Sequence, residues 1–295
     1  MIAAGRLAAI EQGREGDPFG VLGPHELGTG TVVRAFVPGA RALAVIDEHD
    51  RVLAHAEPVG DAGLFEAYLV ETPLRYRLRV TDARGTTRTL DDPYRFGPLL
   101  GELDVWLFAQ GNHLELYRVL GAHPDEIDGV RGTRFAVWAP NASRVSVVGD
   151  WNDWDGRAHP MRLRREAGVW ELFVPGVEPG ARYKYELLGP NGALLPLRAD
   201  PFAFRSEMRP GNASVGEAPS AYAWSDDAWL NVRGPKQRRD APIQIYEVHL
   251  GSWKRIPGED DRFLTYRELA EQLIPYVAEL GFTHIELLPI TEHPF

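Results

Sequence analysis

The sequence has 295 residues, 44% of them hydrophobic and 25% charged, with a formal net charge of -10 at pH 7. This negative charge disfavours nucleic acid or an acidic membrane as a partner, whereas a neutral polymer or small molecule remains suitable. Cysteine is absent, which excludes disulfides, thiolate catalysis and cysteine-ligated metals and fits a reducing cytosol. No apolar run approaches the roughly 18 residues of a membrane helix. We therefore expect a cytoplasmic protein.

An internal repeat organises the first two thirds of the chain. The first copy, within residues 21–96, reads VLGPH, VVRAFVPGARALAVID, GLFEAYL, RYRLRV and DDPYRF. The second, within residues 119–204, reads VLGAH, TRFAVWAPNASRVSVVGD, GVWELFV, RYKYEL and ADPFAF. Because the blocks match in the same order, the pattern predicts two tandem copies of one module.

Each copy is predicted to be a β-sandwich of the immunoglobulin-like type. Its short runs alternate between apolar and polar residues and are separated by Gly, Pro, Asn and Asp, as in half-buried strands. Residues 101–121 between the copies indicate a helical connector that breaks at Gly111 and Asn112. We assign residues 1–110 to the first module with the start of the connector, and 111–225 to the second. Trp138 and Trp170 are expected in the core, within alternating strands.

The pattern changes after a polar segment, residues 217–242, that is predicted to be a linker. Residues 243–249 and 283–289 indicate strands, and residues 265–281 indicate a helix that Thr265 and Glu268 cap and Pro275 kinks. This βαβ unit, in the domain assigned to residues 226–295, exposes apolar faces that only further elements could cover. It is either a small appended subdomain or, as we prefer, the start of a barrel or doubly wound sheet that is truncated here.

The segment VVGDWNDWDG, residues 147–156, is the most distinctive candidate for a binding site. It places Trp151 and Trp154 among short polar side chains, a combination that suits the flat apolar faces and hydroxyl rims of sugars. Either tryptophan could instead plug the end of the sandwich core. Lys184, on the polar face of its strand, could donate to a sugar hydroxyl or be simply solvated. The corresponding segment of the first module, residues 45–53, has no aromatic residue.

The usual catalytic and metal motifs are missing from the sequence. Phosphate-binding, serine-hydrolase, zinc-protease and dinucleotide signatures are absent, and the nine histidines show no metal-ligand spacing. We therefore expect no metal and no cofactor. His249, Glu292 and His293 follow the predicted strands of the βαβ unit and are interpreted as rim or scaffold residues.

Four segments carry a resemblance to a known family. YEVHLGSWKR (246–255), YVAELGFTHIELLPITEHPF (276–295), RFAVWAPNASRVSVVGDWNDWDG (134–156) and GVWELFVPGVEPGARYKYEL (168–187) are similar to the bacterial glycogen (1,4-α-glucan) branching enzymes of glycoside hydrolase family 13. The second module resembles carbohydrate-binding module family 48. The likeness covers nearly the whole chain and implies two β-sandwiches, then a (β/α)₈ barrel, then a C-terminal β-domain.

The resemblance also implies a reaction. Such enzymes cleave an α-1,4 glucan with retention and transfer it to a 6-hydroxyl, using an Asp nucleophile, a Glu acid/base and a second Asp. Retention needs two carboxyl groups about 5 Å apart. In the family these residues follow the fourth, fifth and seventh barrel strands, and no residue here matches them. The chain is thus expected to contain no catalytic residue and to be inactive alone.

The resemblance further suggests a surface site on the second module. Trp154 and Lys184 match positions that bind glucan in related modules, whereas a further stacking aromatic of some relatives is replaced by Leu in NGALLPL (191–197). The module therefore either binds α-glucan or mainly supports the barrel. A monomer is expected. Alternatives are a related debranching or trehalose-releasing hydrolase, and a non-catalytic glucan-binding protein.

Overall fold

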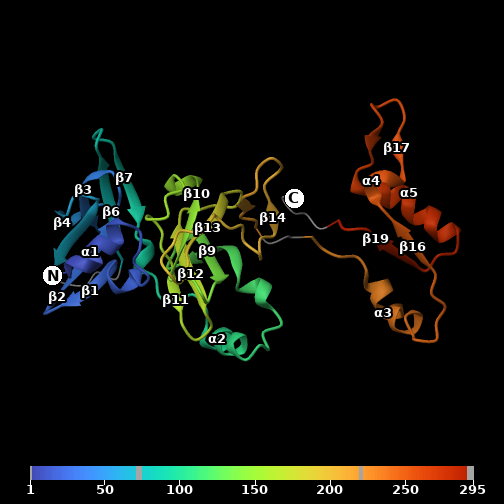
Figure 1. Ribbon diagram of the computed structural model, residues 1–295, viewed down its shortest axis with the longest axis horizontal. Helices are drawn as coiled ribbons and strands as arrows, with labels where there is room; N and C mark the ends of the chain where they lie inside the picture. Colours follow the sequence, from blue (N-terminus) through green and yellow to red (C-terminus); the bar gives the residue numbers. More distant parts are fainter. Residues whose placement is uncertain (1, 71–74, 219–221, 291–295) are drawn as a thin grey trace. The chain divides into compact units, whose positions relative to one another are not determined.

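The computed structural model describes residues 2–70, 75–218 and 222–290. Within them the chain forms two compact units, residues 2–218 and residues 222–290 (Figure 1). Strands dominate the first unit, in agreement with the predicted β-sandwich class, and helices are few. The immunoglobulin-like type and the domain limits assigned from the sequence remain predictions.

The first module is a continuous ladder of strands in the order β1-β2-β5-β4-β3-β6-β7. Its elements are α1 (Ala4–Glu11), β1 (Gly23–Leu27), β2 (Gly30–Phe36), β3 (Ala40–Ile46), β4 (Val52–Val59), β5 (Leu64–Leu69), β6 (Arg77–Asp82) and β7 (Thr87–Asp91). The residues of β4 up to Ala56 pair with β3, and those from Glu57 pair with β5. Buried side chains of β2 and β5 share one core with those of β3 and β6, so the two halves of the ladder pack against each other through their apolar side chains.

The second module consists of two four-stranded sheets, β11-β12-β9-β8 and β10-β13-β15-β14. Its strands are β8 (Gly121–Ile127), β9 (Val130–Trp138), β10 (Arg144–Gly149), β11 (Arg162–Arg164), β12 (Val169–Pro175), β13 (Arg182–Leu188), β14 (Arg205–Ser206) and β15 (Ser214–Val215). The two sheets contribute Phe135 and Trp170, and Val147 and Tyr185, to one core. The alternation read from the sequence therefore places these side chains inside.

The two modules repeat each other in their buried polar contacts. In the first, the hydroxyl of Tyr76 donates to Asp92, and the backbone N–H of Tyr94 donates to the same carboxylate. In the second, Tyr183 donates to Asp200 over 2.7 Å. Tyr76 and Tyr183 occupy the same position in the blocks RYRLRV and RYKYEL. The two sequence copies therefore share this buried contact as well as a sequence pattern.

The connector joins the modules without separating their interiors. It contains α2 (Glu102–Ala109), which ends before the predicted break at Gly111, and a short 3-10 helix, Leu116–Arg118. One hydrophobic core combines Ile10, Leu22 and Tyr94 of the first module with the interior of the second. The predicted boundary at residue 110 therefore does not separate two hydrophobic cores, because residues from both sides of it pack together.

One predicted core residue lies at the surface. Trp170 is buried, as expected, but Trp138 is 56% exposed, so the prediction that it belongs to the core is wrong. Trp138 is the last residue of β9 and points away from the side on which Phe135 and Val137 are buried. Its ring lies 6.2 Å from that of Phe108. At this end of β9 the neighbouring elements no longer cover the strand fully, so the Trp138 side chain is exposed to solvent.

The second unit contains α3 (Asp227–Lys236), β16 (Ile245–Val248), α4 (Leu250–Trp253), β17 (Arg255–Ile256), β18 (Arg262–Phe263), α5 (Tyr266–Glu279) and β19 (His284–Leu287). Strands β16 and β19 pair in parallel, with α5 between them in sequence, so the predicted βαβ unit is present. Thr265 and Glu268 form the predicted capping box. The helix α3 lies within residues 217–242, the segment predicted to be a linker.

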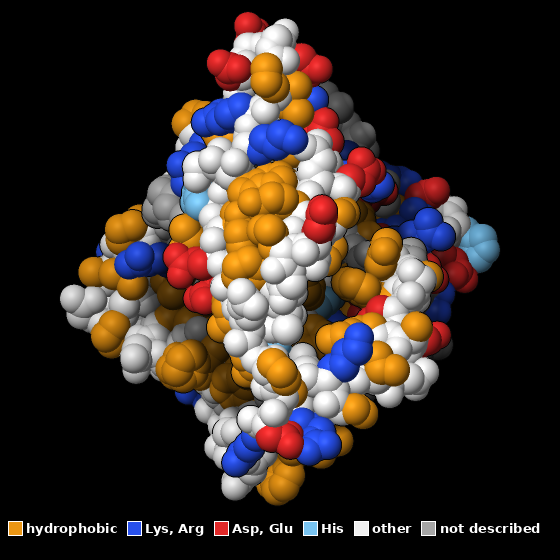
Figure 2. Space-filling model, turned by 90° about the vertical axis from the view of Figure 1, so that its right-hand side faces the viewer, with side chains coloured by type: hydrophobic (Ala, Val, Ile, Leu, Met, Phe, Trp, Pro, Cys, Tyr) orange, Lys and Arg blue, Asp and Glu red, His pale blue; other side chains and the backbone are white. Residues whose placement is uncertain are grey.

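The helix α5 continues through Pro275. Its buried residues Leu269, Leu273 and Val277 follow the helical spacing read from the sequence. Gly281, with φ of +84°, follows its end, as predicted for a C-terminal stop. On the side that faces the viewer in Figure 2, hydrophobic side chains are exposed among polar ones. The exposed hydrophobic residues of this unit include Ile274, Tyr276 and Leu280 of α5, and Leu287 of β19.

Candidate functional site

The candidate binding loop begins where β10 ends. Gly149 lies in a space that a larger residue could not occupy, because a Cβ there would come within 2.3 Å of the Trp151 ring. A 3-10 turn, Asp150–Asn152, follows, and Asp153 then adopts φ of +52°. The chain bends sharply away from the sheet at this point.

Trp154 sits in a strained backbone conformation. Its φ is +58°, in a left-handed region that bulky residues rarely adopt. The indole N–H donates to Asp150 Oδ1 over 3.1 Å, which fixes the ring beside the sheet. The residue is only half-buried. Strained backbone conformations cluster at ligand sites, so this position makes Trp154 a candidate for binding.

Asp150 links Trp154 to the outer face of β13. Arg182 donates to both carboxylate oxygens of Asp150, over 3.0 and 3.1 Å, and also to Glu207 over 2.8 Å. The hydrogen bonds from Arg182 lower the pKa of the Asp150 carboxyl from its ordinary value. Asp150 therefore stays ionised and keeps accepting from the indole at neutral pH.

Lys184 lies two residues after Arg182 and so points to the same side of β13. Its ammonium group donates to the side-chain oxygen of Asn212, which lies just before β15. Trp154, Lys184 and Asn212 are thus brought to the outer face of the sheet β10-β13-β15-β14. Arg182 could have been recognised from the strand alternation. Asn212 could not, because only the fold brings it beside Lys184.

Trp151 occupies a different place from the other two predicted residues. Its ring stacks on that of Phe135, with centroids 5.6 Å apart and planes 26° from parallel, and it packs against the shared core. It therefore supports the loop from the core side, while Trp154 faces outward. This arrangement matches the alternative, left open by the sequence, that one tryptophan plugs the sandwich.

The base of the loop is fixed by Asn152. Its side chain accepts from the N–H of Gly149 over 2.9 Å and donates to Val147 O over 3.0 Å. It also bonds His159 Nδ1 over 2.9 Å. Burial lowers the pKa of His159 to about 4, so its ring is neutral at physiological pH and Nδ1 is free to accept.

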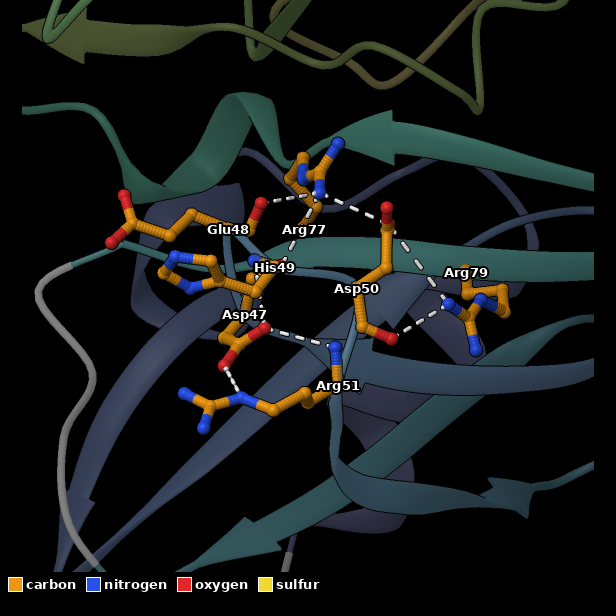
Figure 3. A network of polar contacts seen from close by, with 7 residues as sticks. All are labelled: Asp47, Glu48, His49, Asp50, Arg51, Arg77 and Arg79. Carbon is orange, nitrogen blue, oxygen red and sulfur yellow. Dashed lines mark hydrogen bonds and ion pairs between the residues drawn. The ribbon is translucent and has the colours of Figure 1, made fainter.

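The first module has a different arrangement at the equivalent position. Ile46 pairs with Arg77 as Val148 pairs with Lys184, so the segment after Ile46 corresponds to the loop that carries Trp154. Figure 3 shows that hydrogen bonds and ion pairs hold this segment in place. Asp47 accepts from Arg51 over 2.6 Å, and Arg77 donates to Asp50 over 3.0 Å. This surface thus lacks the tryptophan, and its Asp47 and Asp50 carboxylates are paired with arginines.

The second unit contains a cavity of about 490 Å³ at the carboxyl ends of its parallel strands. The lining includes His249, Tyr266, Leu269, Leu288 and Ile290. His249 comes directly after β16 and bonds Ser252 Oγ over 2.9 Å at the start of α4. Carboxyl ends of parallel strands are where α/β enzymes place their sites. Residues 291–293, which include Glu292 and His293, lie outside the described residues.

Two negative findings concern the described residues alone. Among residues 2–70, 75–218 and 222–290, no group of three or more His, Asp or Glu side chains is placed to hold a metal ion. No helix in these ranges has the length and apolar character needed to cross a membrane.

Two family models match the chain. Residues 3–94 match the model described as "alpha-1,4-glucan branching enzyme GlgB, N-terminal domain", and residues 119–203 match carbohydrate-binding module 48 (isoamylase N-terminal domain). The 1,4-alpha-glucan branching enzyme GlgB of Rhodospirillum rubrum is 53% identical over 98% of this chain and 40% of its own length. The chain belongs to the glycogen branching enzyme family. It corresponds to the N-terminal portion of such an enzyme.

Another relative agrees with this assignment. The 1,4-alpha-glucan branching enzyme GlgB of Rubrobacter xylanophilus is 55% identical over 98% of the chain and 39% of its own length. The chain thus spans about 40% of the length of the curated relatives that it matches. Among solved structures, apo pullulanase from Klebsiella pneumoniae matches 92% of this chain and 33% of its own, with 18% identity and a TM-score of 0.44.

Proposed function

We propose that the chain is the substrate-binding and scaffolding part of a 1,4-α-glucan branching enzyme. Its second module would bind α-1,4 glucan at the outer face of the sheet, with Trp154 as the stacking platform and Lys184 as a hydrogen-bond donor. Trp151 would hold the loop from beneath. The observation that carries this proposal is the half-exposed Trp154 ring, tied to Asp150 in a strained loop.

The chemistry of a glucan suits this surface. A glucose ring offers an apolar face of C–H groups to an indole, and hydroxyls at its rim to short polar side chains. Lys184 and Asn212 already bond each other, so they supply a donor and an acceptor in fixed positions. A neutral ligand also fits a chain whose net charge is -10.

For the whole protein we propose the branching reaction, in which an α-1,4 chain is cut with retention and transferred to a 6-hydroxyl. The βαβ unit would be the start of a (β/α)₈ barrel, after two immunoglobulin-like sandwiches. The catalytic carboxylates would follow later strands, so this chain alone should be inactive. We further propose a cytoplasmic monomer. The names of the similar enzymes favour branching over the debranching and trehalose-releasing alternatives.

The glucan surface is tested with Trp154→Ala and maltoheptaose. Loss of a stacking platform should weaken affinity about tenfold or more, measured by calorimetry on the chain. Trp138→Ala is the matched control, because Trp138 is another exposed tryptophan of the same module and belongs to the other sheet. Equal affinity of the Trp154 variant and the unchanged chain would contradict the proposal.

The reaction is tested by incubating amylose with the full-length enzyme that contains this chain. Transfer should reduce iodine staining of long chains without producing new reducing ends. Accumulation of reducing ends would instead identify a hydrolase. The chain by itself should change neither quantity.

A further inference from the structure

The loop that carries Trp154 is held in part by the first module. The hydroxyl of Tyr94 donates to Pro160 O over 3.2 Å and lies 3.4 Å from Ala158 O. Tyr94 is buried, with 6% of its surface exposed. Both carbonyls belong to the segment by which the loop returns to the sheet. A side chain of one module thus bonds the backbone of the other beside the candidate binding site.

The segment after α1 makes a second contact with the returning chain. Gly13 lies so close to Arg157 that a Cβ there would come within 2.9 Å of Arg157 Cγ. Ile10, Gly13 and Pro18 also line a small cavity together with Arg157 and Pro160. The first module therefore touches the loop at Arg157 as well as at Pro160.

The second module supplies a rigid counterpart to these contacts. Arg144 has 1% of its surface exposed, and it donates to Gly156 O over 2.6 Å and to Ser146 Oγ over 2.8 Å. It also pairs with Glu186. The end of the loop is therefore bonded to Arg144 of β10 on one side and contacts the first module on the other.

We infer that the first module positions the glucan-binding loop, with Tyr94 and the segment at Gly13 as its positioning residues. The inference rests on the proposed function for its ligand, an α-1,4 glucan. The positioning of the loop by the first module does not depend on that ligand. Trp154 lies between the anchored base at Asn152 and the braced return at Pro160. A shift of the return segment should therefore move the ring relative to Lys184. Glucan affinity would depend on a module that itself lacks the aromatic platform.

Gly13→Ala compared with Gly28→Ala is the sharpest test. Both glycines belong to the first module and have similar backbone angles, φ of +63° and +61°, so an alanine costs a similar strain at each. Only at Gly13 would the new methyl group meet the loop, because nothing lies within 4 Å at Gly28. We expect Gly13→Ala to weaken maltoheptaose affinity about three- to tenfold and Gly28→Ala to leave it unchanged.

A second pair removes one hydroxyl group each. Tyr94→Phe loses the bonds to the loop, whereas Tyr68→Phe loses a bond to Glu66 within the first module. One hydrogen bond contributes about 1 kcal/mol, so affinity should fall about two- to fivefold for Tyr94→Phe only. Thermal midpoints of both variants confirm that they are folded.

The indole N–H resonance of Trp154 separates this inference from the proposed function. It is identified as the signal missing in Trp154→Ala, and it should shift and exchange faster in Gly13→Ala and Tyr94→Phe. If maltoheptaose does not bind even the unchanged chain, the proposed function fails while this signal still decides the positioning. An unmoved resonance in both variants overturns the inference.

Discussion

At the scale of single residues, the two tryptophans of one turn have different positions, one packed in the core and one facing outward. Three residues apart, they leave the sheet in opposite senses, because Asp153 and Trp154 both adopt left-handed angles. Trp151 then stacks inward on Phe135, and Trp154 reaches outward to Asp150.

His159 gives this region a predicted pH dependence. Its pKa is about 4 in the folded chain, below the ordinary 6.5, so the unfolded chain binds more protons between these values. The resulting stability is therefore complete above pH 6.5 and is lost as pH falls towards 4. We expect a loss of about 2–3 kcal/mol in unfolding free energy, measured by denaturant titration at pH 7 and pH 4.5. His159→Gln should remove this part of the slope, and an unaltered slope would contradict the assignment.

The sequence identified Trp154 and Lys184 through residue type and alternation. It could not separate Trp151 from Trp154, because the difference depends on the backbone angles between them. Nor could it find Asn212, which lies 28 residues from its partner Lys184. Trp138 was assigned to the core because alternation does not indicate where a strand loses its cover. Short-range pattern was sufficient to predict the strand, whereas the make-up of the candidate site depends on tertiary contacts.

At the scale of elements, a buried carboxylate joins the end of the first module to the second module. Glu171 of β12, with none of its surface exposed, accepts from the N–H groups of Leu99 and Leu100 over 3.0 and 2.8 Å. Arg162 and Arg164 lie 3.6 and 3.8 Å from it. The chain that leaves the first module is thus bonded to the middle of the other module's sheet.

Glu171→Gln should be strongly destabilising. The amide keeps the shape but loses the charge and one acceptor, leaving buried donors without a partner. We expect a loss of about 2–4 kcal/mol in unfolding free energy, measured by urea titration. Glu126→Gln is the control, because Glu126 pairs with Arg131 at an exposed position and should lose less than about 1 kcal/mol. Equal losses of unfolding free energy in the two variants would contradict a stabilising role for the contact between Glu171 and Leu99 and Leu100.

Elements were easier to predict than their extents. The capping box at Thr265 and the periodic apolar residues of α5 located that helix closely, since both signals are local. The helix α3 was missed because the segment is polar and contains Pro235, which the structure places inside the helix. Polarity is compatible with a surface helix, so polar and proline-rich composition alone does not exclude one.

At the scale of the whole molecule, the described chain combines a unit with a shared core and a unit with exposed apolar surface. Side chains from both modules meet in one cluster. The second unit buries Val248, Leu273 and Val277 but leaves Ile245, Ile274 and Leu287 at the surface. The two units should therefore differ in cooperativity and in exposed hydrophobic area.

Calorimetry should reveal this difference. We expect residues 2–218 to unfold in a single transition, because separating the modules would expose Tyr94 and its neighbours in the common core. A ratio of calorimetric to van't Hoff enthalpy near one would agree with this, and two resolved transitions would contradict it. Dye binding that reports exposed apolar surface should be reduced when residues 222–295 are removed.

The matched register of the two modules also defines a design experiment. Ile46 and Arg77 stand where Val148 and Lys184 stand, so the hairpin closed by Asp47 and Arg51 occupies the slot of the tryptophan loop. The copies have diverged in the turn after this strand while keeping the frame around it. Transplanting residues 149–156 in place of 47–51, with Arg77→Lys, would test whether the exchange of one turn gives the first module affinity for maltoheptaose.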